Sequence, residues 1–167
     1  MWNEDGSLQI IDRKKALFKL SQGEYVSPEA VEGAVGVSKW VGQVFVYGNS
    51  FETCVVAVVV PDMEVLSKWV KSNKGDKVSV AEAVKMEDVR KMILDDMIAS
   101  GKQQKLRGFE LPKDVTFETE VNELGQGFTV ENELLTPSMK LKRPQLTKRY
   151  QKEFDAMYKK INEKPAE

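Results

Sequence analysis

Basic side chains gather in two short segments, one near each end of the chain. The first is Asp12-Arg13-Lys14-Lys15, with Lys19 shortly after it, and the second is Lys140-Leu141-Lys142-Arg143-Pro144. A lysine brings a compact charge on a flexible stem, and an arginine brings a planar fork of donors that fits phosphate oxygens. Both suit a site where negative charge gathers during phosphoryl or acyl transfer. Short basic loops are common, however, and each segment alone fits a solvated loop equally well.

The other usual catalytic groups are missing or have no partner. The chain has no histidine, and its one cysteine, Cys54, opens the apolar run 54–60, where a buried small hydrophobe is expected rather than a reactive thiol. Carboxylates such as Asp95-Asp96 and the pair Glu118 and Glu120 lack a partner base or metal-ligand spacing, and we expect them at the surface. No metal site is predicted. These features argue against a self-contained hydrolase or metalloenzyme.

The composition is that of one ordinary globular domain. The chain has 167 residues, of which 41% are hydrophobic and 31% charged, with a net charge of −1. A nucleic-acid-binding domain normally has a clearly basic surface, and this net charge does not indicate one, so nucleic acid is not expected as a partner. No stretch reaches the ~20 apolar residues of a membrane span, and no signal peptide opens the chain, so we expect an intracellular protein, cytoplasmic or on the cytoplasmic face of an organelle membrane.

Alternating and apolar runs predict the strands of the domain that must position the two basic segments. Residues 55–60 are apolar on both faces and predict a central strand of a covered sheet, next to a strand over residues 43–47. The chain enters its first turn and strand without a lead-in, which suggests a piece of a longer protein. The expected strands are 7–11, 43–47, 55–60 and 115–118.

Helix signals fill the rest of the chain. Ser27-Pro28-Glu29 has an N-cap serine, a proline at the first helical position and an early carboxylate. Helices are also expected over 64–71, over about 80–100 with Gly101 as the stop, and from about Pro144 to the end, while Gly125-Gln126-Gly127 is expected to be a loop. The class is α+β, a small mixed or antiparallel sheet covered by helices.

With their neighbours, the two basic segments resemble motifs of the adenylate-forming superfamily. Residues 12–26, including Gly23-Glu24-Tyr25-Val26, resemble the hinge and adjacent loop that open its C-terminal domain. Residues 134–144 resemble its catalytic-lysine loop, in the form carried by eukaryotic long-chain fatty acyl-CoA synthetases. The resemblance covers nearly the whole chain, because the elements between the motifs fall in the expected order. One departure is Glu133, which stands where that subfamily commonly has glycine, and we expect its turn to adopt a positive φ less freely.

The resemblance implies that residues 1–167 are the C-terminal lid of a long-chain fatty acid–CoA ligase. Such an enzyme joins a fatty acid to CoA through an acyl-adenylate, with release of pyrophosphate and AMP, and uses ATP, Mg²⁺ and CoA. The large N-terminal domain that binds ATP and the fatty acid is absent here, so that domain is the expected partner. The chain alone is expected to bind none of these cofactors firmly and to be inactive.

The resemblance also assigns roles to individual residues. Lys140 would reach the site of adenylation, Arg13 would bind the nucleotide, and Lys15 would be the hinge. Lys19, Gly23 and Glu24 would form the loop that faces CoA during thioester formation, although Lys19 could equally be a solvated lysine at a strand edge.

Two other functions remain open at this stage. One is a non-catalytic interaction domain whose basic last helix docks on a partner or on an anionic membrane surface, which would also give peripheral membrane association. The other is the lid of a synthetase for a different carboxylic acid, since acid selectivity belongs to the missing domain.

Overall fold

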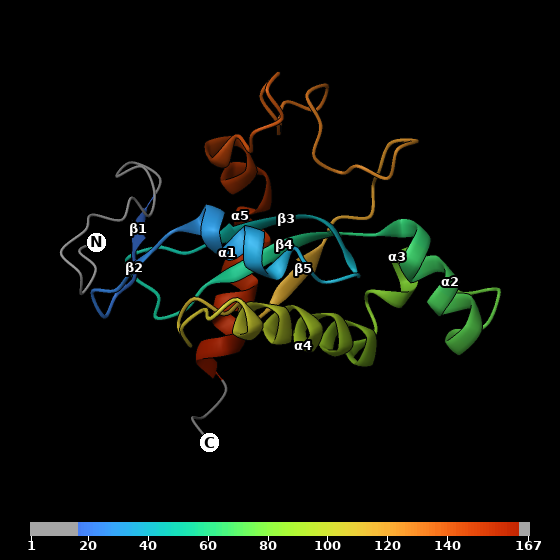
Figure 1. Ribbon diagram of the computed structural model, residues 1–167, viewed down its shortest axis with the longest axis horizontal. Coiled ribbons are helices and arrows are strands. Elements are labelled where there is room, and N and C mark those ends of the chain that lie inside the picture. The colour runs from blue at the N-terminus through green and yellow to red at the C-terminus, as the bar shows by residue number, and fades with distance from the viewer. Residues whose placement is uncertain (1–16, 164–167) are drawn as a thin grey trace.

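The computed structural model describes residues 17–163, which form an α+β fold with helices on both sides of a small sheet (Figure 1). The strand expected over residues 7–11 lies outside the described residues, as do Arg13 and Lys15. The order of elements from β3 onward is strand, strand, three helices, strand and a final helix.

The central sheet has the order β3-β4-β5, built from Val41–Tyr47, Val56–Pro61 and Val115–Phe117. All six residues of β4 are buried, which confirms the predicted central strand. β4 pairs antiparallel with β3 but parallel with β5. A parallel partner needs a crossover, and residues 62–114 supply it through α2, α3 and α4.

Two apolar layers cover the sheet because the side chains of β4 alternate between its faces. Ala57 and Val59 join the core on one face, beneath α1 (Pro28–Val35) and α4 (Glu87–Gln103). Val56, Val58 and Val60 join the core on the other face, against α5. Members of that second core include Phe45, Phe128, Leu134, Leu135, Leu146 and Phe154.

Helix α5 spans Arg143–Glu163 and buries the apolar stripe that its sequence predicts. The helix is kinked at Tyr150, where φ is −106° and ψ is 17°. The Tyr150 hydroxyl donates to Glu118 Oε2 at 2.5 Å, and Arg149 Nη2 donates to the same oxygen at 3.0 Å. Glu118 is therefore buried and paired, and its expected place among the surface charges was wrong.

The predicted helix over residues 80–100 is two helices. Ser79 and Glu82 form a capping box for α3 (Val80–Ala83), and the chain then turns before α4 begins at Glu87. Gly101 does not stop α4. A Cβ there would lie 2.7 Å from Leu111 Cδ2, so this glycine allows a close approach of two segments.

The helix start at Ser27 and the helix over residues 64–71 agree closely with their predictions, whereas no strand was predicted over residues 25–26. Ser27 caps α1 by accepting from the Ala30 amide, as its sequence indicates. The helix expected over 64–71 is α2, Met63–Lys74. Two-residue strands β1 (Phe18–Lys19) and β2 (Tyr25–Val26) pair antiparallel and form a separate small ribbon at one end of the fold (Figure 1).

Candidate functional site

Lys140 lies in a tight hairpin made by residues 134–142. The Thr136 amide donates to the Lys140 carbonyl at 2.8 Å, and the Lys142 amide donates to the Leu134 carbonyl at 2.9 Å. The Thr136 hydroxyl also accepts from the Lys140 amide at 3.1 Å. Leu134 and Leu135 are 3% exposed and fix the first arm in the core. The hairpin thus holds its backbone firmly while Lys140 is exposed.

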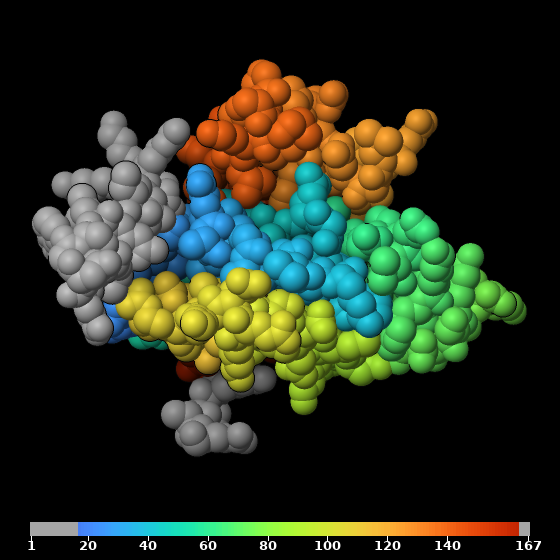
Figure 2. Space-filling view, viewed as in Figure 1, coloured from blue at the N-terminus to red at the C-terminus, as the bar shows by residue number. Residues whose placement is uncertain are grey.

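The Lys140 hairpin projects from the body of the molecule. In Figure 2 the orange segment that contains it stands above α1, apart from the green and yellow helices. Within residues 17–163, the Lys140 ammonium takes part in no ion pair or side-chain hydrogen bond of the structure. The Lys140 ammonium is thus an exposed cation on a fixed backbone, and it is available to an external anion.

The turn that leads into the hairpin adopts the left-handed conformation in spite of its glutamate. Glu133 has a φ of 61°, and the Leu134 and Leu135 amides both donate to the Thr129 carbonyl. Asn132 Oδ1 accepts from the Thr129 amide at 3.0 Å. The expected loss of freedom at Glu133 therefore does not prevent the positive φ, because the surrounding hydrogen bonds hold the turn.

Lys19, Gly23 and Glu24 meet in the β1–β2 turn. Gly23 has a φ of 94°, which a side chain would disfavour, and its amide donates to the Leu20 carbonyl. Glu24 forms an ion pair with Arg107 at 3.7 Å, and the Lys19 ammonium lies 5.7 Å from the centre of the Tyr25 ring. Both charged side chains therefore contact neighbours within the chain.

The β1–β2 turn rests on the segment between β3 and β4. The Ser21 amide donates to the Glu52 carbonyl at 3.0 Å, and Gln22 Nε2 donates to the Thr53 carbonyl at 2.9 Å. The β1–β2 turn and the Lys140 hairpin lie in different parts of the fold (Figure 1). The structure therefore brings Lys19, Gly23 and Glu24 together, but places Lys140 elsewhere.

Sequence reasoning missed one charged pair beside the hairpin. Arg143 Nη1 and Nη2 donate to Glu32 Oε1 and Oε2 at 3.0 and 2.6 Å, and Oε1 also accepts from the Val46 amide at 2.8 Å. Burial raises the pKa of Glu32, and the hydrogen bonds from Arg143 oppose that rise. Along the sequence, Arg143 is 111 residues away from Glu32. No local pattern could have revealed the pair.

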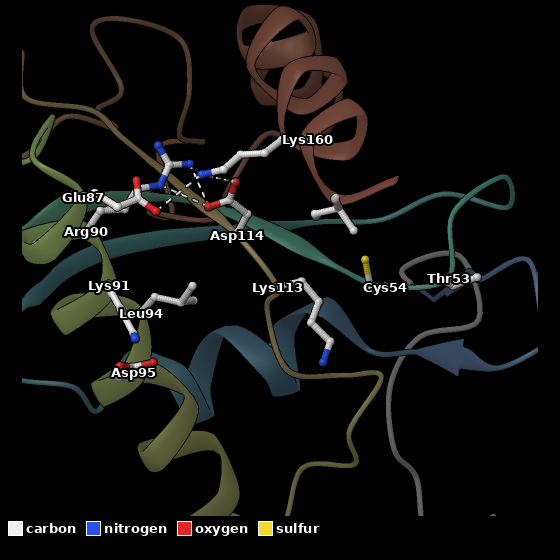
Figure 3. A pocket seen from close by; sticks show the side chains of 11 residues that line it. Thr53, Cys54, Glu87, Arg90, Lys91, Leu94, Asp95, Lys113, Asp114 and Lys160 are labelled. Atoms are coloured by element: carbon white, nitrogen blue, oxygen red, sulfur yellow. Dashed lines mark hydrogen bonds and ion pairs between the residues drawn. The ribbon is translucent and has the colours of Figure 1, made fainter. Parts of the chain in front are cut away.

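A cavity lies elsewhere, between α4, the end of α5 and residues 113–114 (Figure 3). It encloses about 670 Å³. Asp114 Oδ1 accepts from Arg90 Nε and Nη2 at 3.1 and 2.8 Å, and Lys160 lies 3.7 Å from Glu87 and 3.9 Å from Asp114 Oδ2. These charges tie α4 and α5 to the start of β5.

The described residues offer a cation for an anionic ligand but no cluster of metal ligands. Within residues 17–163, no three acidic, cysteine or histidine side chains lie close enough to hold a metal ion. Exposed Lys140 has the chemistry to contact a phosphate or a carboxylate. No helix in the described range is both long and apolar enough to cross a bilayer.

Two curated relatives are similar to almost the whole chain. Fatty acyl-CoA synthetase B of Dictyostelium discoideum is 45% identical over 161 residues, which cover 96% of this chain and 23% of that protein. Long-chain-fatty-acid–CoA ligase 1 of Homo sapiens is 42% identical over 160 residues, which cover 96% and 22%. The chain thus spans less than a quarter of the length of these relatives. No protein-family model matches it.

A solved structure with a similar fold is the A domain of carboxylic acid reductase from Segniliparus rugosus, in complex with AMP and a co-purified carboxylic acid. Its TM-score is 0.74 at 31% sequence identity, over 96% of this chain and 24% of that one. The matched parts are C-terminal regions of adenylate-forming enzymes, and neither alternative function is favoured by these similarities. The chain is therefore a homologue of the C-terminal region of the long-chain acyl-CoA synthetases, with the fold of the corresponding region of adenylate-forming enzymes.

Proposed function

We propose that residues 1–167 are the lid domain of a long-chain fatty acid–CoA ligase and that Lys140 serves its adenylation step. In that step a fatty acid carboxylate attacks the α-phosphate of ATP, which gives acyl-adenylate and pyrophosphate. The thiol of CoA then attacks the acyl carbon, and AMP leaves. The partner of the lid is the large domain of the same enzyme, which binds ATP and the acid.

The observation that carries this proposal is the Lys140 hairpin. Its backbone is fixed by hydrogen bonds and two buried leucines, while the ammonium is free to meet an anion. In a site closed by the large domain, this charge would stabilise negative charge on the α-phosphate and the attacking carboxylate. Met139 beside it is 57% exposed, so the tip also offers apolar surface to that domain.

The β1–β2 turn is proposed to serve the second step, after the lid has rotated. Gly23 lets the backbone pass close to the pantetheine arm of CoA, while Lys19 and Glu24 flank it. Arg13 would contact the nucleotide, and rotation of the backbone at Lys15 would exchange the two turns. The separation of the turn from the Lys140 hairpin supports this division, since two distant loops need a domain rotation to serve one site.

The chain alone is proposed to be inactive. Acyl transfer needs a preorganised site that excludes water, and Lys140 stands on an open surface, away from the cavity of Figure 3. ATP, Mg²⁺ and CoA would therefore bind only with the large domain present. Turnover by the 167-residue chain, measured as CoA thioester formed from palmitate, ATP and CoA, would contradict this.

The decisive experiment is Lys140→Ala in the full-length ligase, with the two half-reactions measured separately in single turnovers. Pyrophosphate release reports adenylation, and CoA thioester formed from supplied acyl-adenylate reports the second step. We expect adenylation to fall by about 10³-fold or more while the second step is largely kept. Lys148→Ala, which removes an exposed lysine of α5, is the matched control. Normal adenylation by Lys140→Ala would refute the assignment.

A further inference from the structure

We infer that Glu32 and Arg143 are the positioning residues that hold the Lys140 hairpin in register for adenylation. The inference rests on the proposed function and extends it to residues that need not touch any substrate. Arg143 begins α5, directly after the last hydrogen-bonded residue of the hairpin, Lys142. Because only Leu141 and Lys142 lie between Lys140 and Arg143, no more than about 10 Å of chain joins them.

The pair ties the segment directly after the hairpin to α1 and β3. Glu32 lies on α1, which packs over the sheet, and its Oε1 accepts both from Arg143 and from the Val46 amide. Val46 belongs to β3, an edge strand of the sheet, so Glu32 also satisfies a backbone donor that has no strand beside it. One carboxylate thus joins α1, β3 and the start of α5.

The bidentate geometry and the burial of the Glu32–Arg143 pair suit it to fix the position of the start of α5. A bidentate guanidinium–carboxylate pair fixes both distance and direction. The side chains of Arg143 and Glu32 are only 25% and 11% exposed, so the loss of one partner leaves the other charge largely buried. The Arg143 guanidinium also lies 5.6 Å from the centre of the Phe45 ring, which limits where it can move.

A second pair on the same helix offers a matched control. Arg149 donates to Glu118 at 3.0 Å, and the two side chains are 41% and 9% exposed. This pair joins α5 to the residue after β5, and within residues 17–163 neither of its side chains forms a hydrogen bond or ion pair with residues 134–142. Loss of Arg149 therefore tests the cost of a broken buried pair in α5 without a change at the hairpin.

The test uses the full-length ligase with Arg143→Lys, Glu32→Gln or Arg149→Met, palmitate as the acid, and the two half-reactions measured separately. Arg143→Lys keeps the charge but loses the bidentate fork, and Glu32→Gln keeps the acceptor for Val46 but loses the charge. We expect each to slow adenylation about 10- to 100-fold, since a misplacement of about 1 Å can cost that much. Thioester formation from supplied acyl-adenylate should change little, and Arg149→Met should leave both steps close to wild type.

A purely structural role would slow both half-reactions together, or would make Arg149→Met as harmful as Arg143→Lys. Either result would overturn the inference. If Lys140→Ala itself leaves adenylation unchanged, the proposed function fails first, whatever the Arg143 variants do. If Lys140→Ala abolishes adenylation and Arg143→Lys does not slow it, only the positioning role fails.

Amide hydrogen exchange on the 167-residue chain gives a readout that needs no activity. In Arg143→Lys, the Lys142 and Thr136 amides should exchange faster than in the parent chain, while the Val58 amide of β4 should be unchanged. In Arg149→Met the hairpin amides should keep their protection. Unchanged exchange at Lys142 in Arg143→Lys would show that the hairpin holds itself without the pair, and would overturn the inference.

Discussion

The Lys140 hairpin and the β1–β2 turn differ in how they are anchored and in which groups they expose. The hairpin is anchored in the core by Leu134 and Leu135 and is followed directly by the Glu32–Arg143 pair, while within residues 17–163 the Lys140 ammonium forms no ion pair. The β1–β2 turn has strands of two residues, its charged side chains contact Arg107 and Tyr25, and Gly23, which has no side chain, is exposed within it. One loop therefore presents a side chain, and the other presents main chain.

The largest test of this contrast is Gly23→Ala. At a φ of 94° an alanine costs about 1–2 kcal/mol, although the nearest atom to the new Cβ, Lys19 Cε, is 3.8 Å away. In the full-length ligase we expect thioester formation to slow about tenfold or more while adenylation is kept, the reverse of Lys140→Ala. Gly108→Ala, at an ordinary φ with open space around it, is the control. Equal loss in both steps would abolish the contrast.

A smaller test concerns the support beneath the β1–β2 turn. Burial raises the pKa of the Cys54 thiol, which follows directly on the Glu52–Thr53 support, so its alkylation at pH 8 should be slow and depend on local opening. Gln22→Ala removes the bond to the Thr53 carbonyl, worth about 0.5–1.5 kcal/mol, and should speed alkylation by about two- to tenfold. Iodoacetamide labelling followed by mass spectrometry measures this.

The same thiol makes a prediction about pH. Because its pKa is raised in the folded state, the folded form favours the protonated thiol, and this contribution to stability is complete below the pKa of the unfolded thiol, about 8.5. It is lost as the pH rises from there through the folded pKa. Cys54→Ala should flatten the fall in the free energy of unfolding between about pH 8.5 and 10. An identical fall in both chains would show that the thiol is not in the buried state described.

The smallest expected effect is at the turn before the Lys140 hairpin. Glu133→Gly should raise the free energy of unfolding by about 0.5–1 kcal/mol, because glycine adopts the φ of 61° without strain but has more freedom to lose. Glu133→Ala keeps the strain and serves as the matched variant. Chemical denaturation of the 167-residue chain measures both. A chain destabilised by glycine would mean that the Glu133 side chain supports the hairpin in another way.

Sequence reasoning predicted the elements well where a local signal was strong. The run of six apolar residues in β4 required a central, covered strand, Ser27 required a helix start, and the apolar stripe of α5 required a buried face. It failed where packing overruled a local signal. Gly101 stays within α4, where Leu111 packs close against it, and α4 begins at Glu87 in the middle of a continuous helical pattern.

The sequence by itself determined the residue types and their order: a basic loop near each end, a glycine in the first turn, and motifs that resemble those of adenylate-forming enzymes. Only the tertiary structure decided which charged side chains are exposed and which are buried in ion pairs. Lys140 and Arg143 look alike in sequence, yet one is exposed and the other is bound by a carboxylate 111 residues away. Glu118, expected at the surface, is buried beneath Arg149 and Tyr150. Burial and pairing depend on contacts between distant segments, and no local spacing encodes those contacts.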